Sequence, residues 1–178
     1  MNIKFKHIAL SLFVVLVFYL GYLAISNLNL KPSDKPIKSL NQFSADLIYP
    51  QGKSFSSKEL AGEFYMVNFF ASWCGHCIDE LKEISQIKDK LPVKYIGIVV
   101  TDSKENIDLL FQYIKNPFDI IIHNNQEVAA NFGNYSLPQN FIVNDKGEII
   151  FKHTGVISKD HFLENIIPFL DEQVKRLN

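Results

Sequence analysis

Apolar residues in the middle of this chain switch between continuous runs and helical spacing. Residues 63–71 contain the run FYMVNFFA and residues 93–100 read VKYIGIVV, so both predict buried β-strands. Between them, apolar side chains recur every three or four positions among charged ones, at Ile78, Leu81, Ile84 and Ile87. This spacing predicts an amphipathic helix that begins at or near Cys74 and is stopped by Leu91-Pro92.

The rest of the chain continues the alternation. In chain order, the pattern predicts a helix that starts at residues 102–105, a strand at 119–122, a short helix at 127–132, a β-hairpin of residues 141–143 and 148–152, and a final helix from Ser158 that Pro168 interrupts. Because strands and helices alternate, we expect an α/β fold with a largely parallel sheet that helices cover on both faces.

The N-terminal region follows neither spacing. Residues 8–28 read IALSLFVVLVFYLGYLAISNL and contain no ionisable side chain apart from tyrosine, over a length that can cross a bilayer core of roughly 30 Å. We therefore expect a cytoplasmic N-terminus at 1–7, a transmembrane anchor at 8–28, a proline-containing linker at 29–40 and an exported domain at 41–178. The alternative is a signal peptide that is cleaved near Ala24-Ile25-Ser26.

Charge changes this picture little. The chain has 18 basic and 19 acidic side chains and a net charge of −1. Without a basic surplus to neutralise phosphates, nucleic acid is not an expected partner.

The candidate chemistry lies in the stretch ASWCGHC at residues 71–77, which holds the only two cysteines of the chain. A bridge between Cys74 and Cys77 closes too short a loop to staple a domain, so we expect a redox-active disulfide. Cys74, at the start of the predicted helix, is the expected nucleophile, because unpaired N–H groups there stabilise a thiolate. Cys77, one turn further, is the expected resolving thiol, and His76 between them can tune the pKa of the Cys74 thiol.

The order of elements, with CxxC between a core strand and the following helix, resembles the thioredoxin fold over residues 40–178. Two stretches carry a closer likeness, VNFFASWCGHCIDEL at residues 67–81 and FGNYSLPQNFIVNDKGEIIFKHTG at residues 132–155. With the N-terminal anchor, they resemble the membrane-anchored thiol-disulfide interchange proteins of cytochrome c maturation, the CcmG/DsbE type of the TlpA-like group. This resemblance implies a central mixed sheet with helices on both faces.

The resemblance also implies roles for further residues. Many thioredoxins place a buried aspartate where this chain has Asn68, and an amide cannot accept a proton, so Glu80 becomes the candidate proton acceptor for Cys77. Pro138 is expected to be a cis-proline beside the cysteines, where it and Leu137 dock a substrate strand. Trp73 is expected to form a partly exposed platform for the substrate.

For function, the resemblance implies a protein-disulfide reductase of the bacterial inner membrane whose domain faces the periplasm. Its expected partners are apocytochrome c, whose haem-binding cysteine pair it reduces, or other exported thiol proteins, and a membrane electron donor of the thiol-disulfide type. No cofactor is expected. The motif CGHC is also that of protein disulfide isomerases, and Gly75 stands where this branch usually has proline, so an oxidant or isomerase for exported proteins is the alternative.

Metal binding is a weaker alternative. Cys74 and Cys77 could form half of a zinc site or a copper chaperone site that histidines complete, and the candidates are His76, His123, His153 and His161. No second CxxC and no H-x₃-H spacing supports either site, so no metal is expected.

Overall fold

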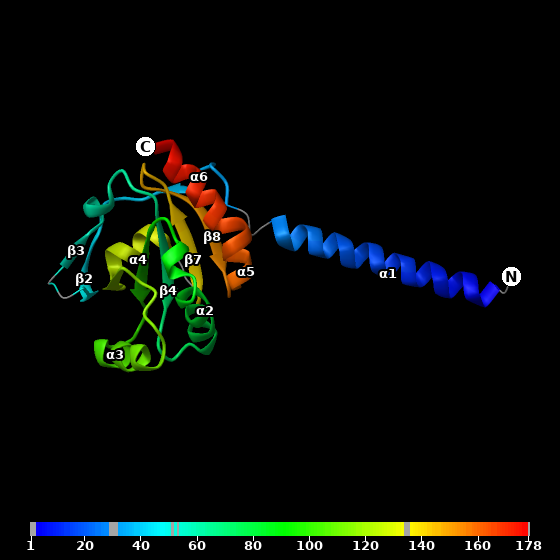
Figure 1. The fold of residues 1–178 in the computed structure, drawn as a ribbon, viewed down its shortest axis with the longest axis horizontal. Coiled ribbons are helices and arrows are strands. Elements are labelled where there is room, and N and C mark those ends of the chain that lie inside the picture. Colours follow the sequence, from blue (N-terminus) through cyan, green and yellow to red (C-terminus); the bar gives the residue numbers. More distant parts are fainter. Residues whose placement is uncertain (1–2, 29–31, 51, 53, 134–135, 178) are drawn as a thin grey trace. The chain divides into compact units, whose positions relative to one another are not determined.

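The computed structural model describes residues 3–28, 32–50, 52, 54–133 and 136–177. The chain divides into two compact units, residues 1–31 and 32–178 (Figure 1). The first contains the helix α1 (Ile3–Leu28). Among the described residues, no helix is both long enough and apolar enough to cross a bilayer. The transmembrane anchor predicted at residues 8–28 is therefore not confirmed.

The second unit is an α/β domain built on one sheet. Its strands are β1 (Lys38–Ser39), β2 (Ser44–Tyr49), β3 (Ser54–Ser56), β4 (Tyr65–Phe70), β5 (Lys94–Val99), β6 (Ile120–His123), β7 (Gln139–Val143) and β8 (Glu148–Thr154). Its α-helices are α2 (Gly75–Ser85), α3 (Lys104–Tyr113), α4 (Gln126–Phe132), α5 (Lys159–His161) and α6 (Ile167–Leu177). From β4 onward, the elements follow the predicted order.

The sheet is mixed, in the order β1-β8-β7-β4-β5-β6-β2-β3. Strands β4, β5 and β6 are parallel neighbours, and β7 runs antiparallel to β4 and forms the predicted hairpin with β8. The carboxyl end of β4 therefore lies in the middle of the sheet, where it feeds directly into α2 (Figure 1).

Strand β4 is buried on both faces, which explains its continuous apolar run. Met66 and Phe70 pack on one face with residues of α2, α3 and α6, whereas Val67 and Phe69 pack on the other with residues of α4. The polar residue Asn68 interrupts this run, yet it is as buried as its neighbours.

The N-terminal edge of the domain departs from the prediction. Strand β1 pairs with β8, and Ile37 N and Leu40 N donate to Ile149 O and Gly147 O at 2.6 and 2.9 Å. Part of the expected linker at 29–40 thus belongs to the sheet, and the compact unit begins at Pro32 rather than at residue 41. Residues 29–31 of that linker lie outside the described residues.

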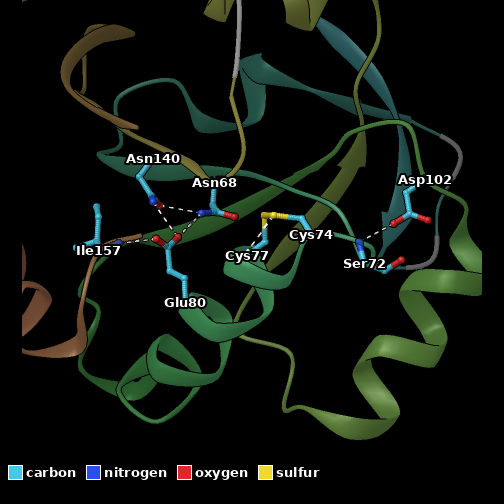
Figure 2. The surroundings of a disulfide bond; sticks show 8 residues. All are labelled: Asn68, Ser72, Cys74, Cys77, Glu80, Asp102, Asn140 and Ile157. Carbon is cyan, nitrogen blue, oxygen red and sulfur yellow. Dashed lines mark hydrogen bonds between the residues drawn. A yellow bond between two sulfur atoms is a disulfide. The ribbon is translucent and has the colours of Figure 1, made fainter. Parts of the chain in front are cut away.

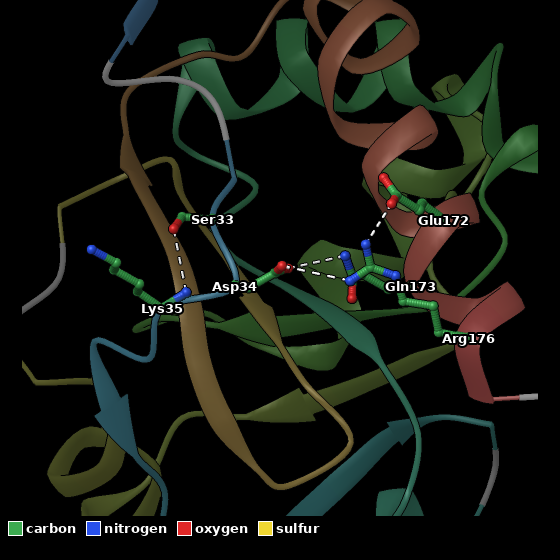
Figure 3. A network of polar contacts seen from close by, with 6 residues as sticks. All are labelled: Ser33, Asp34, Lys35, Glu172, Gln173 and Arg176. Atoms are coloured by element: carbon green, nitrogen blue, oxygen red, sulfur yellow. Dashed lines mark hydrogen bonds and ion pairs between the residues drawn. The ribbon is translucent and has the colours of Figure 1, made fainter.

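The segment before β1 is also tied to α6 (Figure 3). Asp34 accepts a hydrogen bond from Gln173 Nε2 at 3.0 Å and pairs with Arg176 at 3.6 Å. Arg176 in turn contacts Glu172 one turn earlier on α6, at 2.5 Å. These contacts join the first residues of the domain to its last helix.

The final helix is interrupted, as the presence of Pro168 predicts. The interruption is a change of helix type before Pro168. Residues Phe162–Ile166 form a π-helical turn between α5 and α6, with Ile167 N donating to Phe162 O. Pro168 has no N–H to donate, and a wider turn before it accommodates the missing bond.

Candidate active site

The two cysteines lie where β4 ends and α2 begins, and they form a disulfide (Figure 2). Cys74 is the N-cap of α2, with an extended backbone, and its Sγ accepts a hydrogen bond from Cys77 N at 3.2 Å. Cys74 is partly exposed, whereas Cys77 is fully buried. A client thiol can therefore reach Cys74 but not Cys77.

This placement suits Cys74 for nucleophilic attack. A side chain at the N-cap faces the unpaired N–H groups and the positive end of the helix dipole, both of which stabilise a thiolate over a thiol. The hydrogen bond from Cys77 N is one of these interactions. His76 is exposed on the first turn of α2, so its proposed effect on the Cys74 thiol stays a prediction.

The residues before Cys74 are held by the loop after β5. The Asp102 carboxylate accepts hydrogen bonds from Ser72 N at 2.6 Å and from Ser103 N at 2.9 Å. Burial raises the pKa of Asp102, but these bonds and one from Asn106 outweigh it and hold that pKa below its ordinary value. Asp102 is thus an ionised clamp on the segment that leads to Cys74.

Trp73 is largely exposed, at 63%, beside the nucleophile. Its indole Nε1 donates to Thr101 O at 3.1 Å, which fixes the ring on the same loop. The expected exposure of Trp73 is therefore found, and its contact with a substrate stays a prediction.

Glu80 lies one turn after Cys77 and is completely buried. Its Oε1 accepts hydrogen bonds from Asn68 Nδ2 at 2.7 Å and Asn140 Nδ2 at 2.9 Å, and its Oε2 accepts one from Ile157 N at 2.7 Å (Figure 2). Burial raises the pKa of Glu80 to about 7, although these three donors favour the ionised form. A carboxyl group with this pKa can both take and return a proton near neutral pH.

The partners of Glu80 come from distant parts of the sequence. Asn68 on β4 and Asn140 on β7 are directly opposite each other in the antiparallel ladder, and Asn68 Nδ2 donates to Asn140 Oδ1 at 3.0 Å. Asn140 Oδ1 also accepts from Tyr95 Oη at 3.3 Å. Burial, and secondarily the charge of Glu80, raises the pKa of the Tyr95 phenol, so it stays a neutral donor.

Pro138 lies directly before β7, and its position beside the cysteines stays a prediction. The Leu137–Pro138 peptide bond is cis, as the resemblance implied, with Pro138 buried and Leu137 half-buried. Pro138 O accepts a hydrogen bond from Gly155 N at 2.9 Å. The loop that follows β8 therefore touches both Pro138 and, through Ile157 N, Glu80.

Sequence reasoning missed Asp102, Tyr95, Asn140 and the backbone of Ile157. None of them lies near ASWCGHC in the chain, and only the sheet register brings Asn140 opposite Asn68. A polar residue inside the buried run of residues 139–143 was the one available signal for Asn140, since buried amides need partners.

The histidines considered for a metal site do not join the cysteines. Within the part of the chain that the structure describes, no three side chains of His, Cys, Asp or Glu lie close enough together to hold a metal ion.

The chain is similar to known thiol-disulfide proteins. Residues 33–167 match the Redoxin family. The chain is 24% identical to the thiol:disulfide interchange protein DsbE of Vibrio cholerae over 98% of this chain and 97% of that protein. It is 23% identical to the thiol-disulfide oxidoreductase ResA of Bacillus thuringiensis over 66% of this chain and 72% of that protein.

Solved structures support the fold. A secreted thiol-disulfide isomerase from Corynebacterium glutamicum superposes with a TM-score of 0.63 at 16% identity, over 74% of this chain and 85% of that one. At this level of identity, the likeness establishes a thioredoxin-like fold and nothing finer.

Proposed function

Because the chain belongs to the redoxin family, we propose that this thiol-disulfide oxidoreductase works as a reductant of exported proteins. Its proposed client is the haem-binding cysteine pair of apocytochrome c. The observation that carries the proposal is the buried Glu80 one turn after Cys77, held by three hydrogen-bond donors with a pKa of about 7. An acid at this position is also a feature of the cytochrome c maturation branch.

The geometry supports a two-step reduction that starts from the dithiol form. The Cys74 thiolate attacks a client disulfide, a mixed disulfide forms, and one client sulfur leaves as a thiolate that takes a proton from solvent. Cys77 then passes its thiol proton to the Glu80 carboxylate and attacks Cys74 Sγ. The Cys74–Cys77 disulfide forms, the second client sulfur leaves as a thiolate that takes a proton from solvent, and two electrons have moved to the client.

The second step needs a local base because Cys77 is fully buried. A buried thiol has its pKa raised by desolvation, so it is a poor nucleophile until a proton acceptor is close. In this role Glu80 replaces the aspartate of other thioredoxins, since Asn68 in that position cannot take a proton. A membrane electron donor of the thiol-disulfide type then returns the domain to the dithiol form.

Client docking is assigned to the surface around Cys74. A client strand is proposed to pair with the backbone of Leu137, since the cis-proline that follows cannot donate a hydrogen bond. The exposed Trp73 ring is proposed to pack against the same strand.

We also place the domain outside the cytoplasm, attached to the bacterial inner membrane through residues 8–28. The support is the absence of ionisable side chains other than tyrosine from that stretch. Fractionation of intact cells tests it. Release of the full chain from membranes by alkaline carbonate would contradict the attachment.

A second function is favoured by Gly75 and His76 at the start of α2. They complete the CGHC motif, and a protonated His76 next to Cys74 would stabilise the thiolate and make the couple more oxidising. An oxidant or isomerase of exported proteins is therefore the alternative.

The client class can be tested by trapping. In Cys77→Ser, the mixed disulfide at Cys74 cannot be resolved, so it should accumulate with the client. We expect the full-length variant to capture apocytochrome c in its native membrane, and the double variant Cys74→Ser, Cys77→Ser to capture nothing. Trapped complexes that contain many exported disulfide proteins and no cytochrome would favour the alternative.

A further inference from the structure

Asn68 projects toward the cysteines from the middle of β4. Side chains alternate along a strand, and those two residues before and after it, Met66 and Phe70, belong to the same buried cluster as Cys77. Asn68 therefore faces α2 and not α4. With an exposed fraction of 0%, it has no access to solvent.

The hydrogen bonds of Asn68 determine which way its amide points. Nδ2 lies 2.7 Å from Glu80 Oε1 and 3.0 Å from Asn140 Oδ1. Both neighbours are acceptors, so the amide nitrogen must face them and the oxygen must point away. Figure 2 shows Asn68 Oδ1 on the side of the Cys74–Cys77 disulfide, opposite Glu80.

This oxygen is the unusual atom of the site. Asn68 Oδ1 is buried and has no hydrogen-bond partner among the residues that the structure describes. An unpaired acceptor in the core costs free energy, and a well-packed domain tolerates few of them. The disulfide on the side to which this oxygen points carries no hydrogen, so the oxidised state offers no donor there.

The reduced state does offer a donor. When the disulfide takes up two electrons and two protons, Cys77 regains an S–H group in the same buried space. We propose that Asn68 is a positioning residue for this thiol: in the dithiol form its Oδ1 accepts a hydrogen bond from the Cys77 S–H group, while its Nδ2 donates to the Glu80 carboxylate. One amide then fixes the two groups between which the proton passes.

This arrangement has a thermodynamic consequence. The S–H···O bond exists only in the dithiol form, so Asn68 stabilises that form relative to the disulfide. Replacing Asn68 by leucine, which is similar in size, removes the acceptor and should shift the equilibrium with glutathione toward the disulfide by on the order of fivefold, as for one net hydrogen bond. A purely structural role would destabilise both redox forms equally and leave this equilibrium unchanged.

The test separates Asn68 from the proposed role of Glu80, on which the proton-transfer part of the inference rests. The full chain carrying Glu80→Gln is the parent, and the equilibrium constant with glutathione is measured with and without Asn68→Leu. We expect the fivefold shift in this background too, because the thiol proton and not the carboxylate makes the bond. The proposed reductant role is tested separately, by trapping clients with Cys77→Ser. The proposal for Asn68 and the proposed function can therefore fail independently of each other.

Two matched variants complete the test. Asn140→Leu also removes an amide donor to Glu80, but it removes no atom that faces Cys77. We therefore expect the equilibrium constant of this variant with glutathione to stay within twofold of that of the parent. Asn68→Asp keeps an oxygen in place and should not move toward the disulfide; it also serves if Asn68→Leu does not fold. The inference is overturned if Asn68→Leu shifts the equilibrium less than twofold, if Asn140→Leu shifts it as far, or if Asn68→Asp also moves fivefold toward the disulfide.

Discussion

Glu80 combines complete burial with three hydrogen-bond donors, which are Asn68, Asn140 and the backbone of Ile157. Burial dominates, which raises its pKa to about 7, while the donors keep the ionised form within reach. The resemblance pointed to this residue, because Asn68 stands where many thioredoxins have a proton-accepting aspartate. Its burial and partners could not be predicted, because they depend on the register of β4 with β7.

The pH dependence of the resolution step tests Glu80 as a base. A mixed disulfide of Cys74 with thionitrobenzoate releases the yellow thiol when Cys77 attacks. We expect the single-turnover rate to rise with pH through about 7, where Glu80 ionises, and Glu80→Gln to lower it by roughly 100-fold and lose that inflection. The exposed Asp79→Asn is the control, and an unchanged profile in Glu80→Gln would rule out the role.

Stability gives an independent check on the same carboxyl group. Its pKa rises from 4.5 in the unfolded chain to about 7 in the folded domain, so its contribution is fully present below pH 4.5 and is lost as the pH rises through 7. Over that window, we expect about 3 kcal/mol of destabilisation that Glu80→Gln lacks.

Urea unfolding of the oxidised protein at pH 5 and pH 8 measures this difference. His153 titrates with the opposite sign, because burial lowers its pKa, so only the comparison of wild type with Glu80→Gln isolates Glu80. Parallel pH profiles for the two proteins would show that the pKa of Glu80 is ordinary.

At the scale of elements, the continuous apolar runs identified the central strands β4 and β5, and the three-to-four spacing identified α2. Two of the missed strands, β2 and β3, have short and mixed patterns: β3 spans Ser54–Ser56 with one buried residue, Phe55. Such strands form because the edge of β6 is available, as shown by the antiparallel pairing of β2 with it. The pattern of apolar and polar residues in a segment does not show whether the edge of another strand is free to pair with it.

The packing of β5 against its neighbours makes a sharp prediction at Gly97. A Cβ there would lie 2.8 Å from Phe70 Cε1 and 3.0 Å from Phe118 Cδ2, two rings that stack on each other. We expect Gly97→Ala to cost about 1–3 kcal/mol of unfolding free energy, since a packed core resists insertion. Gly75, where a Cβ meets nothing within 4 Å, is the matched control.

Urea denaturation of the two variants at one pH measures the effect. Gly75→Ala should stay within about 0.5 kcal/mol of wild type, as surface changes usually do. Equal stabilities of Gly97→Ala and Gly75→Ala would mean that the aromatic rings move aside without cost.

For the whole molecule, the sequence led to the right class of fold and order of elements, but it set the start of the domain too late. Prolines and charges in residues 29–40 suggest a tether, yet β1 and Asp34 bind this segment to β8 and α6. Contacts between the two ends of a domain leave no local pattern in the sequence.

Truncation tests the boundary. A fragment that starts at Pro32 should unfold cooperatively, whereas one that starts at residue 41 loses β1 and the Asp34 contacts and should be less stable by about 1–3 kcal/mol, because the pairing of β1 with β8, the bonds of Lys38 Nζ to Ala130 O and Asn131 O and the Asp34 contacts are removed together. Thermal unfolding of the two fragments measures this. Identical midpoints would show that residues 32–40 add nothing to the domain.

The direction of electron flow is the central claim about the molecule, and it is read most directly from the redox state of Cys74 and Cys77 in intact cells. Rapid acid quenching followed by alkylation with a mass-tagged maleimide separates dithiol from disulfide on a gel, with Cys74→Ser as the marker for one free thiol. A reductant that a membrane donor recharges should be found mostly as the dithiol. A pair found mostly as the disulfide would contradict the account and assign the chain to the oxidation of exported proteins.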